Sequence, residues 1–195
     1  MLTIILIAVV IIITLYFLTT YNSFVTTKVR VNASIQEIGN QLKRQADLIP
    51  NLETSAKAYL KHEKDIFDKL TSARKAVETA VKSGDVSKMA QSADQVQELL
   101  RGLTVIMESN PQIKGADVIS QLMDELRDTS DKVMYSRRTL IDLTADYNTL
   151  VATFPSKIIA GVFNFTALPG FATPTEGEHL EISGQDLKTP KVKLD

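Results

Sequence analysis

The chain opens with a long run of apolar residues. No charged side chain occurs from Leu2 through Thr20. A helix of roughly 17 to 19 residues is about 26–28 Å long, which is close to the hydrocarbon thickness of a bilayer. The run therefore predicts a membrane anchor over residues 1–20. The positions expected to contact lipid are Leu2, Ile5, Val9, Ile12, Leu15 and Leu18.

A cleaved signal peptide is the competing interpretation of this run. It would need a basic segment before the apolar core, a shorter core and a cleavage site of small residues. Met1 is followed at once by Leu2, and the run ends in the bulky residues Tyr16, Phe17 and Leu18. The sequence therefore favours a retained anchor.

Basic residues after the run predict the orientation of the chain in the membrane. Lys28, Arg30, Lys43 and Arg44 follow the anchor, whereas only the amino terminus precedes it. By the positive-inside rule, Met1 lies outside and the large domain lies in the cytoplasm. The alternative is that these residues belong to an ordinary solvated helix face.

Beyond the anchor, apolar residues recur in alternating steps of three and four, the spacing of antiparallel bundles and coiled coils. Four such rows of apolar residues (seams) can be followed. The first two comprise Phe24, Val31, Ile35, Ile38, Leu42 and Ile49, and then Leu52, Ala56, Tyr59, Ile66, Leu70, Ala73, Val77 and Ala80. The third comprises Val86, Met89, Ala93, Val96, Leu100, Leu103 and Met107. The fourth comprises Ile119, Leu122, Leu126, Val133, Leu140, Leu143, Tyr147, Leu150 and Phe154, with Thr129 and Ser136 as polar members.

The seams predict an all-α protein in which residues 21–154 form an antiparallel up-down bundle of four long helical segments. Gly84 suits the position after a helix end, and Asp85 can cap the next helix. Pro50 leaves two interpretations, since the register continues across it. The segment lengths favour a break at Pro50, with Asp47 accepting hydrogen bonds from a new helix that begins there. The alternative is one kinked helix that runs from the membrane to Lys82, through Asp47, Pro50 and Asn51.

The residue composition changes after Pro155, from long seams to a short apolar segment and then a polar stretch. Residues 155–171 form an apolar segment too short to span a bilayer, with Ser156 expected as a helix N-cap. This segment either folds over the open end of the bundle or meets the lipid surface or another subunit. The candidate contact residues are Ile158, Ile159, Val162, Phe163 and Phe165. Residues 172–195 are polar, punctuated by proline and glycine, and predicted to be a flexible tail.

Composition offers little for catalysis or nucleic-acid binding. The net charge is −1, so we expect no nucleic-acid partner. The chain has no cysteine that could act as a nucleophile. His62 with Asp65 provides too few ligands for a metal, and His179 lies in the predicted tail. We therefore predict no catalytic residue, no cofactor and no small-molecule substrate. Glu63 interrupts the second seam, either at a rim position with access to water or paired with Arg137 or Arg138.

Several stretches resemble one protein family. They are Tyr21-Asn22, the QLKRQADLIPNL stretch at 41–52, Tyr147-Asn148, and the FPSKIIAGVFNF stretch at 154–165. From the anchor to about Phe165 the chain resembles the LemA family. The resemblance implies a bacterial protein with one N-terminal membrane helix, a helical bundle and no established enzymatic activity. We expect the protein in the inner membrane or in a membrane derived from it. One branch, which resembles the magnetosome protein MamQ, is linked to the formation of membrane vesicles.

Two functions fit these expectations. The first is a non-enzymatic, self-associating helical scaffold that organises or shapes membrane, with the bilayer and other copies of the chain as its partners. The second is a membrane-anchored adaptor or signalling module that presents its bundle to another membrane or cytoplasmic protein.

Overall fold

The computed structural model describes residues 1–57, 64–110 and 117–169. Five α-helices make up most of them: α1 (Leu2–Ala56), α2 (Lys64–Ser83), α3 (Val86–Ser109), α5 (Asp117–Ala152) and α6 (Ser156–Val162). The described residues contain no strand. The predicted all-α class is confirmed.

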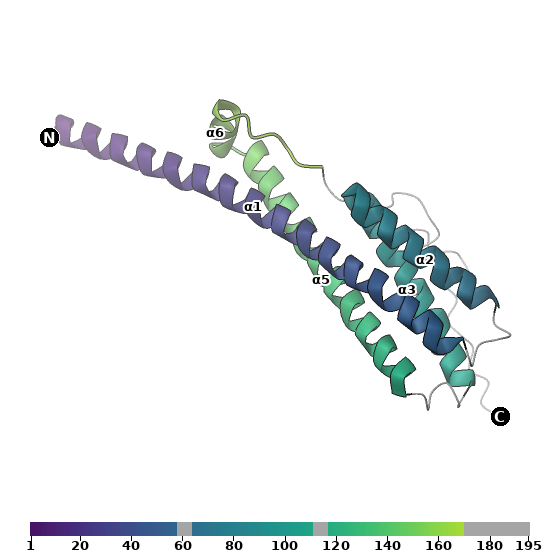
Figure 1. The fold of residues 1–195 in the computed structure, drawn as a ribbon. Coiled ribbons are helices and arrows are strands. Elements are labelled where there is room, and N and C mark those ends of the chain that lie inside the picture. Colours follow the sequence, from purple (N-terminus) through teal and green to yellow (C-terminus); the bar gives the residue numbers. More distant parts are fainter. Residues whose placement is uncertain (58–63, 111–116, 170–195) are drawn as a thin grey trace, which may run out of the picture.

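Four helices form the predicted antiparallel bundle. α1, α2, α3 and α5 run alternately in opposite directions, with α5 and α2 packed against α1 and α3 packed against α2 (Figure 1). The first part of α1 projects beyond the bundle, and none of the other described helices lies beside its amino-terminal end (Figure 1). α6 follows α5 at the end of the bundle nearest this projection (Figure 1).

α1 is continuous through Pro50, so the favoured break at this residue is wrong. The alternative of one helix holds through Pro50 but not as far as Lys82, because α2 begins at Lys64 as a separate helix that runs in the opposite direction (Figure 1). The helix has 55 residues and is about 82 Å long at 1.5 Å per residue. It ends at Ala56, before residues 58–63, which lie outside the described part of the chain. Pro50 is tolerated because Ile49 and Leu52 on either side of it are buried in the core, and this packing offsets the backbone bond that proline lacks.

Side chains next to Pro50 hydrogen-bond to the carbonyls of the same turn. Asn51 Nδ2 donates to the main-chain carbonyl of Asp47 at 3.3 Å, and Thr54 Oγ1 donates to the carbonyl of Pro50 at 2.9 Å. Because no helix begins here, the expected capping role of the Asp47 carboxylate is also wrong. The DLIPNL stretch is instead the interior of a proline-containing helix.

The turn between α2 and α3 forms as expected. Gly84 has a positive φ of 65°, which a residue without a Cβ adopts easily. Asp85 Oδ1 accepts hydrogen bonds from Ser87 N at 2.8 Å and Lys88 N at 3.2 Å. Asp85 therefore caps α3.

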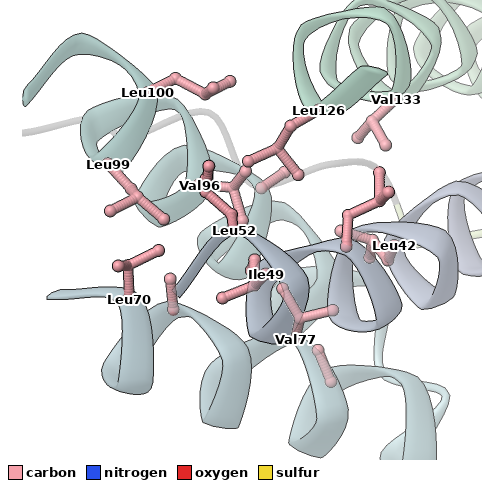
Figure 2. Packing of buried hydrophobic residues seen from close by; sticks show 14 of the residues in the cluster. Leu42, Ile49, Leu52, Leu70, Val77, Val96, Leu99, Leu100, Leu126 and Val133 are labelled. Carbon is pink, nitrogen blue, oxygen red and sulfur yellow. The ribbon is translucent and has the colours of Figure 1, made fainter. Parts of the chain in front are cut away.

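The bundle core contains the predicted seams. Figure 2 shows Leu42, Ile49 and Leu52 of α1 between side chains of the other bundle helices. The buried seam residues with larger side chains include Phe24, Ile38, Leu42, Ile49, Leu52, Leu70, Val77, Val96, Leu126 and Tyr147. Leu48, Leu99 and Met123 are also buried although they lie outside the predicted seams, so the apolar stripes of α1, α3 and α5 are wider than one row.

Two positions differ from the predicted seams. Phe154 is 82% exposed because it lies beyond Ala152, where α5 ends and the helical period no longer directs it to the core. Gln45, which interrupts the first seam, is fully buried. Its Nε2 donates to Ser130 Oγ at 3.0 Å, which explains how the core accommodates an amide.

Candidate membrane-facing surface

The first part of α1 has the properties of a membrane span. Among the described residues, α1 is the one helix long and apolar enough to cross a bilayer, and the span window is uncovered by the rest of the protein. All six predicted lipid-contacting residues are exposed: Leu2, Ile5, Val9, Ile12, Leu15 and Leu18. Side chains this apolar are exposed without a partner only at considerable free-energy cost in water.

The junction between α5 and α6 is held by Ser156. Its hydroxyl donates to the carbonyl of Leu150 at 2.7 Å and to that of Thr153 at 2.9 Å. These carbonyls belong to the end of α5 and to the residue after it. Pro155 occupies the N-cap position of α6, with no side-chain cap. The expected N-cap role of Ser156 is therefore wrong, since its hydroxyl bonds backward to the preceding helix.

α6 ends in a tight reversal at Asn164. The amide of Phe165 donates to the carbonyl of Ala160 at 2.9 Å, and the amide of Asn164 donates to that of Gly161 at 3.4 Å. Asn164 has a φ of 55°, the left-handed conformation that asparagine tolerates better than most residues. This pair of bonds is a Schellman motif, and it sends the chain after α6 back along the bundle.

The two phenylalanines on either side of this reversal pack on α1. Phe163 lies against Phe17 and Tyr21, with ring centroids 5.6 and 4.7 Å apart respectively. Phe165 stacks on Phe24, with ring centroids 4.7 Å apart and 18° between the ring planes. Phe17, Tyr21 and Phe24 are spaced by four and then three residues, so they share one face of α1.

Tyr147 of α5 completes this aromatic cluster, which we define as Phe17, Tyr21, Phe24, Tyr147, Phe163 and Phe165. Its ring meets Phe24 edge to face, with centroids 5.7 Å apart and 83° between the planes. Burial raises the pKa of the Tyr147 phenol above its ordinary value of 10.0, because the phenolate loses its hydration there. The side chain is therefore a neutral packing group at physiological pH.

After Phe165 the chain is tied to α5 by one asparagine. Asn148 Nδ2 donates to the carbonyl of Leu168 at 2.9 Å, and the amide of Leu168 donates to Asn148 Oδ1 at 2.8 Å. Leu168 is partly buried and packs against both the bundle core and the aromatic cluster. Residues from 170 onward, including the predicted tail, lie outside the described part.

The predicted contact residues of the C-terminal segment fall into two groups. Ile159 is buried, and Phe165 packs in the aromatic cluster. Ile158 and Val162 are exposed at 58% and 64%, and Phe163 is exposed at 42%. The segment thus folds over the end of the bundle and still keeps part of its apolar surface uncovered.

A cavity of about 600 Å³ opens between α1, the start of α3 and α5. Val31, Leu140 and Leu168 line it on the apolar side. Arg137 Nη1 and Asp94 Oδ1, 3.2 Å apart, form an ion pair at its edge. No sequence pattern indicated this cavity, since its lining comes from three helices and the segment after α6.

The described residues contain no group of three or more histidine, cysteine, aspartate or glutamate side chains able to hold a metal ion. His62, Glu63 and His179 lie outside the described ranges. Arg137, one of the two partners considered for Glu63, makes an ion pair with Asp94.

The comparison with protein families decides the classification. The LemA family matches residues 34–183, most of the chain. The chain belongs to the LemA family. The matched region includes most of the bundle, α6 and the Asn148–Leu168 contact, and it begins within α1, beyond the candidate span. LemA is not a known enzyme family. No curated protein is similar enough to this LemA-family chain to count as a match.

Proposed function

We propose that this LemA-family protein is a non-enzymatic, single-pass protein of the bacterial inner membrane. Its bundle lies in the cytoplasm and acts as a self-associating scaffold that organises or shapes the membrane. The observation that carries the proposal is the continuity of α1 from Leu2 to Ala56. The candidate span and a central helix of the bundle are one element, so a contact between bundles fixes the spacing and tilt of the spans they hold.

The basic residues after the span support the proposed orientation. Lys28, Arg30, Lys43 and Arg44 are all exposed. They are therefore available on the side of the membrane where positive charge is retained. The first of them lies eight residues beyond Thr20, about 12 Å along the helix, within reach of the anionic lipid surface.

An uncovered apolar stripe on α1 offers a surface for self-association. Leu18, Val25 and Val29 are spaced by seven and four residues, so they share one face of the helix. Val25 and Val29 are 39% and 61% exposed, although they lie beyond the uncharged run. Confinement to a membrane raises the effective concentration of such surfaces, so weak lateral contacts suffice.

Disulfide crosslinking in membranes tests this proposal. The chain has no cysteine, so a single introduced cysteine is its only thiol. We expect oxidation to crosslink Val29→Cys into a dimer in membranes that contain the full-length protein. Arg101→Cys, at an exposed position on α3, is the matched control and is expected to crosslink much less.

A strictly monomeric protein would contradict the scaffold. That result would be light scattering at the monomer mass in detergent, together with no crosslinking at either position in membranes. If one unrelated protein then co-purified in a fixed ratio, the adaptor function would replace the scaffold.

A further inference from the structure

An apolar ridge remains uncovered at the end of the bundle nearest the candidate span. Ile158 and Val162 lie four residues apart on α6 and are 58% and 64% exposed, and Phe154, in the turn before α6, is 82% exposed. We call these three side chains the ridge. The opposite face of α6 is occupied, since Ile159 and Ala160 are buried in the aromatic cluster. α6 is therefore apolar on both faces, whereas a helix that merely covered a bundle end would present polar residues to water.

The ridge is held at the level where the uncharged run of α1 ends. Phe163, directly after α6, contacts Phe17 and Tyr21, which lie on either side of Thr20. Phe17 is three residues before Thr20, about 4.5 Å along the helix. If α1 spans a bilayer, this depth corresponds to the boundary between the acyl chains and the head groups.

The charge around the ridge favours a lipid surface over a protein partner. From Thr149 to Pro169 the only charged residue is Lys157, which is exposed beside Ile158. An exposed apolar face with a flanking lysine is the composition of segments that lie in the membrane interface, where the lysine meets anionic head groups. The surface of the candidate span continues directly into this region through Phe17 and Phe163.

We propose that the Phe154, Ile158 and Val162 side chains insert into the interfacial layer of the bilayer that holds α1. The protein then contacts the membrane at two places, through the span and through α6. Two contacts restrict the tilt of the bundle relative to the membrane plane, whereas a single helix leaves that tilt free. This inference rests on the membrane anchoring in the proposed function and adds a second lipid contact to it.

Site-specific fluorescence in vesicles tests the second contact. Full-length Ile158→Cys and Val162→Cys variants would each carry an environment-sensitive dye and be reconstituted into vesicles of phosphatidylcholine and phosphatidylglycerol. Leu15→Cys, in the span, is the positive control, and Tyr135→Cys, at an exposed position on α5, is the negative control. We expect blue-shifted emission, and quenching by lipids that carry a nitroxide near the head group, at positions 15, 158 and 162 but not at 135.

The outcomes separate this inference from the proposed function. Quenching at position 15 without quenching at 158 and 162 overturns the second contact and leaves the anchor intact. A blue shift at 158 that needs a high protein-to-lipid ratio and is not quenched by the lipids also overturns it, since it indicates a second copy of the chain on the ridge. Absence of quenching at position 15 refutes the anchor itself. Circular dichroism of each variant establishes that the bundle is folded.

Discussion

Asn148 pairs with Leu168 through both its amide nitrogen and its amide oxygen, at 2.9 and 2.8 Å. The side chain of one residue thereby satisfies the main-chain donor and acceptor of another, as a neighbouring strand would. This contact is the side-chain tether between α5 and the segment after α6. The segment in turn keeps Phe165 on α1.

Removing the amide of Asn148 should loosen this segment without unfolding the bundle. In Asn148→Ala, two main-chain groups of Leu168 lose their partners, at a free-energy cost of about 1–3 kcal/mol for local opening. Hydrogen exchange measured by mass spectrometry should become faster for a peptide covering Leu168. Thr149→Ala is the matched control, since Thr149 is exposed and its hydroxyl bonds only to the carbonyl of Ala145 within α5. Equal exchange rates in the two variants would contradict the tether.

Substitutions of the buried pair Gln45 and Ser130 should have strongly non-additive effects on the free energy of unfolding. Gln45 Oε1 is buried without a protein hydrogen-bond partner, so this amide is only half satisfied. Ser130→Ala leaves the Nε2 group without a partner as well and should lower the free energy of unfolding by about 1–3 kcal/mol. Adding Gln45→Leu removes the whole buried polar group and should restore most of that loss. Urea unfolding in detergent of the two single variants and the double variant measures the coupling, and additive effects would refute it.

Pro50 predicts a stabilising substitution. Pro50→Ala supplies an amide that can donate to the carbonyl of Ala46, and alanine is favoured over proline in a helix interior by about 3 kcal/mol. Ile49 and Leu52 are packed around the helix as it is with proline, and repacking offsets part of this gain. We therefore expect the unfolding free energy to rise by about 1–3 kcal/mol. Asn51→Ala, which removes the bond to the carbonyl of Asp47, should lower stability slightly. A loss of stability in Pro50→Ala would mean that the core requires proline at this position.

Tyr147 predicts a loss of stability in alkaline solution. The pKa of its phenol is raised in the folded protein by burial, so the folded state holds the proton more tightly than the unfolded state does. Stability is therefore unaffected by this group below about pH 10 and falls as the pH rises beyond that value. Urea unfolding at increasing pH should show a steeper decline for the natural protein than for Tyr147→Phe. Tyr135, which is exposed, provides the matched variant Tyr135→Phe, and its decline should equal that of the natural protein.

The bundle was predictable because burial repeats along each helix. Leu42, Leu70, Val96 and Leu126 belong to different seams, and a period of three and four residues needs no knowledge of the partner helix. Whether the helix breaks or continues at Pro50 was not predictable from local sequence, because the same register of apolar residues fits both. Packing on both sides of the proline decides between them.

The periodic spacing of apolar residues could not predict polar contacts between residues that are far apart in sequence. In the sequence, Gln45 only interrupts its seam. Its hydrogen-bond partner Ser130 is 85 residues away, so the pair is visible only in the structure. Asn148 and Leu168 are 20 residues apart, and a reversal at Asn164 separates them. The aromatic spacing at Phe17, Tyr21 and Phe24 is visible in the sequence, but the residues that cover it are fixed only by that reversal.

Because α1 is one continuous helix, the rotation of the bundle about the helix axis is set by the number of residues in its apolar N-terminal part. Each residue of an α-helix turns the chain by about 100°, so one residue inserted near Leu15 would rotate every face of the bundle by that angle relative to the outermost turns of α1. Insertions of one to four alanines would step the bundle around the full circle. If copies associate as proposed, they would then meet through different sides, and their crosslinking should rise and fall with the helical period.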